Sequence, residues 1–270
     1  MINAIHEGDC ASLLGKLDNS SIDLTITSPP YDNLRDYEGY EFYFEIIAQQ
    51  LYRITKNGGV VVWVVGDATI KGSETGTSFR QALFFMDMGF NLHDTMIYQK
   101  DNPPPVGGSN RYYQAFEYMF VFSKGKPKTF NPLMQKRRNK WNDKRTTRYR
   151  GVTRNKNGEF VKKQVPINEV VKGQNLWKYM VGGGISTMDK EAFKHPAIFP
   201  EKLAEDHILS WSNVGDIILD PMCGSGTTLK MAKMNNRKYI GIDISPEYCE
   251  IARSRVNGIS FSPLSKYLNR

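Results

Sequence analysis

The apolar residues of this chain fall into two recurring patterns, short continuous runs and helically spaced stretches. Residues 60–65, Val-Val-Val-Trp-Val-Val, form the strongest run and predict a strand that is buried on both faces. Residues 40–55 carry apolar side chains at helical spacing, and Asn57-Gly58-Gly59 is expected to end that helix. The alternation of such strands and helices predicts an α/β fold with a mostly parallel sheet.

Other segments extend this pattern along the chain. Further strands are predicted at residues 2–6, 22–26, 217–219 and 239–242, and further helices at residues 11–17, 78–88, 200–212, 227–234 and from 246 onward. Residues 92–99 and 118–123 flank a loop rich in proline and glycine, and we expect them to form an antiparallel hairpin.

The composition narrows the class of protein. No apolar run approaches the ~18 residues of a membrane span, and residues 1–7 lack the basic flank and apolar core of a signal peptide. Cys10, Cys223 and Cys249 have no paired spacing, so neither a disulfide framework nor a metal site is expected. We therefore expect a cytoplasmic protein with reduced thiols.

The net charge of +8 is concentrated in one segment. Residues 124–179 hold 17 Lys and Arg against 3 acidic residues, a net +14, whereas the rest of the chain holds 19 against 25, a net −6. Aromatic residues are interleaved with these charges. Arginine binds phosphate and aromatic rings stack on bases, so the segment is interpreted as a small nucleic-acid-binding region, with a disordered insert as the alternative.

The residues that follow the predicted strand at 22–26 carry functional groups that are unusual for a plain turn. Thr27-Ser28-Pro29-Pro30-Tyr31 places a hydroxyl, carbonyls without intervening N–H groups and an aromatic ring side by side. Open α/β sheets bind ligands at the carboxyl ends of their strands. Such a turn can accept hydrogen bonds from a planar amino group and stack on its ring, although a plain Pro-Pro turn with a surface tyrosine is the simpler reading.

A second candidate site lies near the end of the chain. The pattern is that of a nucleotide-binding βαβ unit: a strand, the glycine pair of Gly224-Ser225-Gly226, a helix, a second strand and then Asp243. Asp243 is placed to accept ribose hydroxyls. Threonines occupy the place of the third glycine of a dinucleotide fingerprint, which favours a ligand without a pyrophosphate.

These two motifs resemble those of a known family. The stretch Asp220-Pro221-Met222-Cys223-Gly224-Ser225-Gly226-Thr227-Thr228 is similar to the S-adenosylmethionine-binding motif of amino-methylating DNA methyltransferases, and Thr27-Ser28-Pro29-Pro30-Tyr31 is similar to their catalytic motif, a variable polar residue followed by Pro-Pro-Tyr. The order of catalytic motif, basic segment and cofactor motif is that of the β class. Gly8-Asp9-Cys10 resembles the N-terminal cofactor-contacting turn of that class.

The resemblance implies a seven-stranded, mostly parallel sheet with helices on both faces and a permuted motif order. Residues 1–123 would form the catalytic half, residues 124–190 a basic target-recognition region, and residues 191–270 the cofactor-binding half. The implied cofactor contacts are Asp9, Cys10, Asp220, Pro221, Met222, Cys223, Gly224, Ser225, Gly226, Thr227, Thr228 and Asp243. The expected DNA contacts are Arg137, Arg138, Lys140, Arg145, Arg148 and Arg150.

The implied reaction is direct methyl transfer to an exocyclic amine of a flipped base. Ser28 Oγ and the Pro29 carbonyl would hold the amino hydrogens, Pro30 would stiffen the turn and Tyr31 would stack on the base. In this family a serine before Pro-Pro-Tyr is associated with N4 of cytosine, so we expect that target, with N6 of adenine as the alternative.

Other functions and partners stay open at this point. An inactive DNA-binding regulator and a methyltransferase for RNA or protein amines are the competing functions. The expected partner is double-stranded DNA, in the cytoplasm of a prokaryotic or phage-type, nucleoid-associated setting. The sequence leaves open whether the chain also pairs with a cognate restriction endonuclease or with a second copy of itself.

Overall fold

The computed structural model describes residues 1–30, 42–103, 110–137, 147–166, 168–182, 184–189, 191–192, 195, 198 and 200–259, with side chains at 147–151, 153 and 162–166 left undescribed. Internal contacts divide the chain into two compact units. The first combines Met1–Asn131 with Asn175–Arg270, and the second is Pro132–Gln174. The predicted recognition region therefore contributes residues 124–131 and 175–190 to the first unit.

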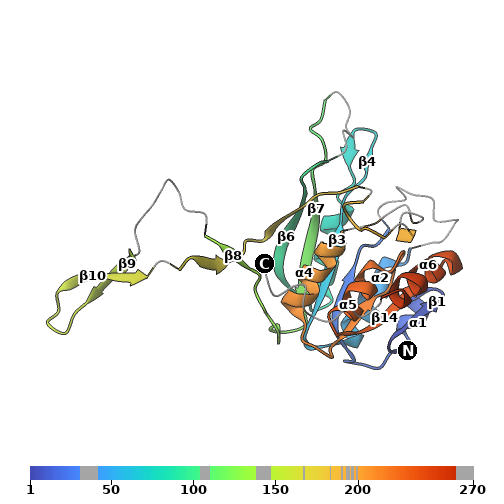
Figure 1. Ribbon diagram of the computed structural model, residues 1–270, viewed down its shortest axis with the longest axis horizontal. Helices are drawn as coiled ribbons and strands as arrows, with labels where there is room; N and C mark the ends of the chain where they lie inside the picture. Colours follow the sequence, from blue (N-terminus) through green and yellow to red (C-terminus); the bar gives the residue numbers. More distant parts are fainter. Residues whose placement is uncertain are drawn as a thin grey trace. The chain divides into compact units, whose positions relative to one another are not determined.

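The first unit is built from the following elements in chain order (Figure 1): β1 (Ala4–Glu7), α1 (Cys10–Leu14), β2 (Ile22–Thr27), α2 (Phe44–Ile54), β3 (Thr55–Val65), β4 (Thr69–Ile70), β5 (Ser73–Glu74), α3 (Thr77–Asp87), β6 (Asn91–Lys100), β7 (Phe116–Ser123), β12 (Leu176–Tyr179), α4 (Glu201–Trp211), β13 (Ile217–Asp220), α5 (Thr227–Met234), β14 (Lys238–Asp243) and α6 (Pro246–Asn257). None of these helices is long and apolar enough to cross a membrane, as far as the described residues go.

Eight of the described strands of this unit form one large sheet in the order β1-β14-β13-β2-β3-β7-β6-β12, and β4 and β5 form a separate antiparallel pair. Within the large sheet only β7 runs against its neighbours, so the expected hairpin of β6 and β7 and the mostly parallel α/β fold are both confirmed. The sheet has eight strands where the sequence analysis expects seven. The additional edge strand is β12, which lies inside the predicted recognition region.

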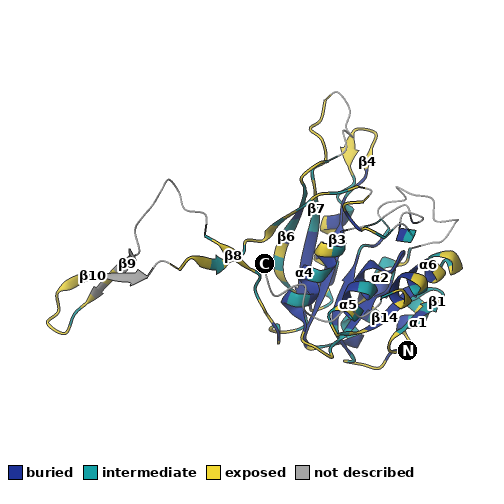
Figure 2. Cartoon of the chain, viewed as in Figure 1, coloured by how far each residue is buried: buried dark blue, intermediate teal, exposed yellow. Residues whose placement is uncertain are grey.

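Strand β3 shows why the sheet needs helices on both faces. Its residues alternate between two apolar clusters, with Val60, Val62 and Val64 in one and Val61, Trp63 and Val65 in the other. The first cluster also contains side chains of α4, α5 and α6, and the second contains side chains of α1, α2 and α3. The strand is consequently buried on both sides, as its unbroken apolar run predicts (Figure 2).

One local expectation is wrong. Asn57-Gly58-Gly59 does not lie between a helix and a strand, because α2 ends at Ile54 and β3 begins at once at Thr55. The register with β2 shifts across this stretch, so that Ile22 pairs with Thr55 but Leu24 pairs with Val60. The glycines accommodate an irregularity inside the strand.

The second unit consists of two antiparallel ribbons. Strands β8 (Met134–Lys136) and β11 (Val170–Lys172) form the shorter one, and β9 (Thr147–Arg154) and β10 (Phe160–Pro166) form the longer one. None of the described side chains in this unit is buried. Its fold therefore rests on backbone pairing.

Candidate active site at the carboxyl edge of the sheet

The sheet order brings the predicted motifs to one edge. Strands β1, β14, β13 and β2 are consecutive and parallel, so their carboxyl ends lie side by side. Asp9, Asp243, Asp220 and Ser28 come at or directly after these four ends. Segments that are more than 190 residues apart in the sequence thus meet at the place where open α/β sheets bind ligands.

A buried hydrogen bond joins the two main motifs. Thr27 Oγ1, at the end of β2, donates to Asp220 Oδ1 at 2.8 Å, and Asp220 is only 2% exposed. The same Asp220 oxygen accepts the Met222 N–H at 3.3 Å, inside the cofactor-type loop. Burial raises the pKa of Asp220 to about 6, although its hydrogen bonds act in the opposite direction.

Asp243 holds the glycine loop from the other side. Its Oδ2 accepts the Gly224 N–H at 2.7 Å, and its Oδ1 accepts the Ser245 N–H at 3.0 Å. Burial raises the pKa of Asp243 above its ordinary value. The carboxyl group is therefore a fixed acceptor at the end of β14, and each oxygen keeps a lone pair for a further hydroxyl donor.

Both glycines of the loop are required by their surroundings. Gly224 has φ +48° and Gly226 has φ +76°, in the left-handed region that favours glycine. A Cβ on Gly224 would lie 2.7 Å from the His195 ring, and one on Gly226 would lie 2.7 Å from Ala252 Cβ. The loop backbone is thus packed closely against its own protein, as a preformed ligand cradle must be.

A buried arginine fixes the far side of the loop. Arg255 of α6 has a fully buried side chain and donates to Ser225 O and to Thr227 Oγ1, the latter at 3.2 Å. It also pairs with Asp189 at 2.9 Å and with Glu201 at 2.9 Å. The pairing with Arg255 holds the pKa of Asp189 below its usual range in spite of partial burial.

These contacts decide which atoms of the loop face a ligand. Ser225, Thr227 and Thr228 are at most 4% exposed. Arg255 takes the first two hydroxyls, and Thr228 Oγ1 lies 3.4 Å from the Ile26 carbonyl. The predicted cofactor contacts at these three positions would accordingly be made by the backbone.

Asp9 and Cys10 lie next to Asp243, as the resemblance implies. The Gly8 N–H donates to the Asp243 carbonyl at 2.9 Å, and Glu7 pairs with Asp243 in the β1–β14 register. The Asp9 side chain caps α1 by accepting the Ser12 N–H at 2.7 Å. Burial raises the pKa of the Cys10 thiol to about 12, so the thiol is neutral.

The catalytic motif is described in part. Ser28 and Pro30 are half-buried and Pro29 is buried at the end of β2, whereas Tyr31 lies outside the described residues. Ser28 is therefore placed directly after Thr27, whose hydroxyl is fixed on Asp220. Ser28 is thus the residue that directly follows the point where the two motifs are joined.

The predicted DNA contacts belong to the second unit. Arg137 is half-buried, and its N–H donates to the Glu169 carbonyl at 2.7 Å. Arg148 and Arg150 lie in β9, but their side chains are not described, and Arg138, Lys140 and Arg145 lie outside the described residues. No group of metal-ligating side chains occurs in the described part of the chain.

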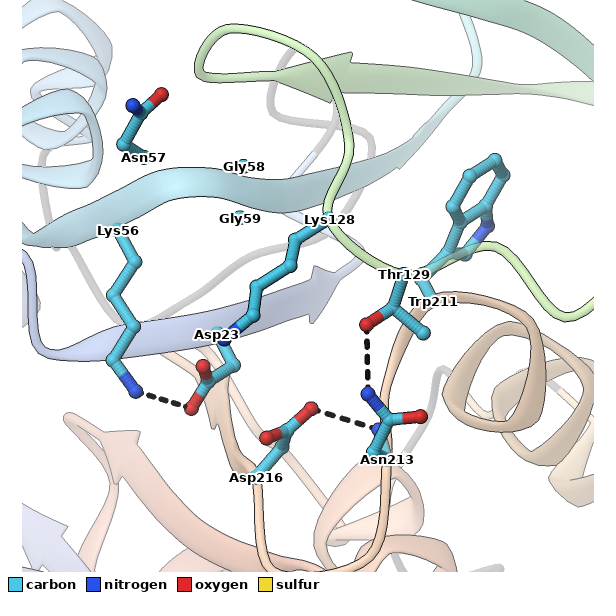
Figure 3. Close-up of a pocket in the computed structure, with 10 residues that line it drawn as sticks. All are labelled: Asp23, Lys56, Asn57, Gly58, Gly59, Lys128, Thr129, Trp211, Asn213 and Asp216. Atoms are coloured by element: carbon cyan, nitrogen blue, oxygen red, sulfur yellow. Dashed lines mark hydrogen bonds and ion pairs between the residues drawn. The ribbon is translucent and has the colours of Figure 1, made fainter.

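Figure 3 shows a pocket at the opposite edge of the sheet, with a volume of about 50 Å³. Asp23, Lys56 and Asp216 line it at the beginnings of β2, β3 and β13, and Lys56 Nζ lies 2.6 Å from Asp23. This pocket is remote from the predicted motifs, because parallel strands put all their carboxyl ends at the other edge.

Two features of the site are not predicted from the sequence: Arg255, and the hydrogen bond of Thr27, itself part of the predicted stretch, to Asp220. Arg255 interrupts an otherwise apolar helix face, three residues after Ala252 and next to Val256, and a charged residue at such a position is a readable sign of a buried partner. Thr27 gives a weaker sign, since a threonine at a strand end is ordinary.

Comparisons with known proteins agree with this geometry. Residues 22–254 match a family model described as DNA methylase, of the N6/N4 type. The chain is 63% identical to the orphan methyltransferase M.BamHII of Bacillus amyloliquefaciens, over 87% of this chain and 89% of the relative. It is 26% identical to the type II methyltransferase M.HinfI of Haemophilus influenzae, over 97% of this chain and 70% of the relative.

Solved structures share the fold. The cytosine-N4-specific PvuII DNA methyltransferase superposes with a TM-score of 0.68 at 22% identity, over 96% of this chain and 89% of that one. The complex of M1.HpyAVI with S-adenosylmethionine gives a TM-score of 0.62 at 23% identity, over 94% and 98% of the two chains.

The raised pKa of Asp220 predicts a pH-dependent stability difference. The folded state binds the Asp220 proton more tightly than the unfolded state, so this group contributes stability below about pH 4 that is lost as pH rises through about 6. Asp220→Asn keeps an acceptor oxygen for Thr27 but does not titrate. The unfolding free energy of the variant minus that of the wild type should rise by up to ~3 kcal/mol between pH 4 and 7 in urea titrations. A difference that stays constant with pH would contradict the assignment.

Loss of the buried arginine predicts a large destabilisation. Arg255→Met leaves the loop oxygens without this donor, while Asp189 and Glu201 keep Lys230 at 3.5 and 2.8 Å. We therefore expect an unfolding free energy lower by roughly 2–4 kcal/mol, with part of it restored in Arg255→Lys. Arg253→Met is the matched control on the same helix, because Arg253 is one-third exposed and pairs with exposed Glu250. Its cost should stay within about 1 kcal/mol. Equal costs for the two methionine variants would contradict the role given to Arg255.

Proposed function

Because the chain belongs to the DNA methylase family of the N6-adenine/N4-cytosine type, we propose that it methylates the exocyclic N4 of cytosine in duplex DNA. The family makes the chain an amino-methylating DNA methyltransferase with S-adenosylmethionine as its cofactor. The observation that carries the proposed active site is the Thr27–Asp220 hydrogen bond, which holds the strand before Ser28 against the start of the glycine loop.

The residues present fit the cofactor. When bound, S-adenosylmethionine supplies a methyl group on a cationic sulfonium leaving group. Gly224 and Gly226 present a backbone without side chains, and the Asp243 carboxylate offers free lone pairs to ribose hydroxyls. Asp9 and Cys10 lie beside Asp243 at the end of β1. Asp220 is buried and would support the loop by accepting the Met222 N–H.

The catalytic turn would activate the target amine by geometry. An exocyclic amine is a poor nucleophile because its lone pair is delocalised into the base. Ser28 Oγ and the Pro29 carbonyl would accept its two hydrogens and tilt the nitrogen towards a tetrahedral shape, while Pro30 stiffens the turn and Tyr31 stacks on the flipped base. The Cys10 thiol has a raised pKa and is neutral, which argues against a thiolate mechanism at that position.

The choice of cytosine over adenine rests on Ser28. A hydroxyl makes one moderate contact to the amine, whereas the acidic or amide side chains found elsewhere in the family would accept more strongly. N6 of adenine is the alternative target. A duplex DNA substrate would place the reaction beside the nucleoid of a prokaryotic cell.

The function is tested by the product. Unmethylated duplex DNA is incubated with the chain and S-adenosylmethionine, and its nucleosides are then separated by mass spectrometry. We expect N4-methylcytosine. N6-methyladenine would overturn the choice of base, and transfer to RNA or protein alone, or no transfer at all, would overturn the DNA reaction and favour the competing functions.

The same assay separates the roles of two side chains. Ser28→Ala should lower methyl transfer roughly 5- to 100-fold, the cost of one lost hydrogen bond to the reacting amine, with cofactor affinity nearly intact. Asp243→Ala should instead raise the cofactor dissociation constant, measured by calorimetry, because it removes both the ribose acceptor and the anchor of Gly224. Loss of cofactor affinity alone in both variants would refute this division.

Two protein partners remain proposals. The relative at 63% identity is named an orphan methyltransferase, which favours a chain that acts without a cognate restriction endonuclease.

A homodimer is supported by α3, where Phe79, Leu83 and Met86 form an exposed apolar stripe at helical spacing. Arg80 and Asp87 flank the stripe on one side, so antiparallel pairing of two α3 helices would place each arginine opposite the other copy's aspartate. Leu83→Glu should sediment as a monomer where the wild type sediments as a dimer. Identical sedimentation of the two would remove this face from consideration.

A further inference from the structure

The longer ribbon of the second unit ends in a well-defined turn. Asn155 Oδ1 accepts the N–H groups of Asn157 and Glu159, at 3.0 and 2.9 Å. The Asn155 N–H donates to the Glu159 carbonyl at 2.9 Å, and the Gly158 N–H donates to the Asn155 carbonyl at 3.0 Å. Gly158 takes φ +81°, which suits a glycine. These bonds fix the register in which Arg154 pairs with Phe160.

The last cross-strand pair before this turn presents a stacked arginine. Arg154 Cζ lies 4.9 Å from the centre of the Phe160 ring. A guanidinium stacked in this way loses little further freedom when its fork of donors binds a planar acceptor. We call residues 154–161 the ribbon tip.

Apolar side chains at the ribbon tip are exposed, as far as the described part of the chain shows. Phe160 is 71% exposed, Val161 is 42% exposed and the neighbouring Val152 is 57% exposed. The second unit holds 13 Lys and Arg against 3 acidic residues, a net +10, whereas the rest of the chain holds 23 against 25. An occupant of this surface must therefore offer negative charge together with flat or methylated apolar groups, as the edges of DNA bases and the phosphates beside them do.

The dimensions of the ribbon select one groove. Two paired strands lie about 4.8 Å apart, and with their side chains they fit the major groove, which is about 12 Å wide, but not the minor groove, which is about 6 Å wide. The pairing of β9 with β10 contains a bulge, where Val152 pairs with Lys162 but Tyr149 pairs with Gln164. A bulge increases the twist of a ribbon, as following a helical groove requires.

From the proposed function and these observations together, we propose that the ribbon tip enters the major groove of the target duplex. Arg154, held by Phe160, reads a guanine there through its O6 and N7 atoms. The exposed Phe160 and Val152 contact neighbouring base edges such as thymine methyl groups. Lys156, exposed in the turn, contacts phosphate and carries no sequence information.

The test compares Arg154→Ala with Lys156→Ala on defined duplexes. The methylated sequence is first identified by sequencing DNA treated with the wild type. Binding of that duplex, and of each single-base-pair variant of it, is then measured with the full chain in the presence of S-adenosylhomocysteine, which fills the cofactor site but cannot donate a methyl group. Arg154→Ala should weaken binding of the target roughly 5- to 150-fold and remove discrimination at one G·C pair. A duplex with 7-deazaguanine at that position should weaken the wild type but not the variant.

Lys156→Ala is the matched control, since it removes one exposed cation from the same turn. It should weaken all duplexes by a similar factor and reduce the slope of log affinity against log salt concentration by about 0.9. Phe160→Ala with Arg154 retained should lose part of the discrimination, because the arginine is no longer stacked. Unchanged far-UV circular dichroism and unchanged cofactor affinity verify that the variants are folded.

Several results would overturn the proposal. Arg154→Ala would do so if it weakened all duplexes equally, as a phosphate contact would, or if it had no effect. Equal or tighter binding of single-stranded DNA or RNA would exclude a groove-reading ribbon. Because binding is read without turnover, a chain that binds its sequence but transfers no methyl group would contradict the proposed function and leave this inference standing. If the protein transfers no methyl group, its target sequence is identified instead by selecting the duplexes that it binds from a pool of random sequences.

Discussion

The hydrogen bond between Thr27 and Asp220 is the constraint on which the active edge depends. It is buried, it joins residues 193 positions apart, and it connects the end of the catalytic strand to the start of the glycine loop. Burying a carboxyl group is costly unless donors compensate for the lost water. The donors here come from both motifs, so each motif is in place only when the other is.

The sheet makes the order of the motifs along the chain unimportant. The first strand of the chain, β1, pairs in parallel with the last, β14, and β2 pairs with β13. All four deliver their following loops to one edge, whichever is synthesised first. A permuted order therefore costs nothing in geometry, and the long segment between the two halves can host an unrelated unit.

The sequence allows the prediction of features that depend on local pattern. Three local patterns each have one strong structural solution, and these predictions are confirmed: the unbroken apolar run of β3, the proline end of β2 and the glycine pair before α5.

The features that the sequence does not predict depend on partners far away in the chain. Strand β12 is four residues long with half-exposed side chains, and only pairing with β6 makes it a strand. Arg255 is explained by its contacts with Asp189, Glu201 and the glycine loop, which no spacing rule connects. The site roles stay predictions, and Tyr31 lies outside the described residues.

The second unit has a consequence for how such enzymes diverge. Its described side chains are all at least partly exposed, so replacing one of them removes little packing and costs little folding free energy. The central strands β2, β3 and β13, by contrast, are mostly buried, so most changes there remove a packed contact. Mutations can therefore accumulate in the ribbons at almost no stability cost, and with the ribbon tip proposed as the element that reads DNA, new sequence preferences could arise there while the sheet stays constant.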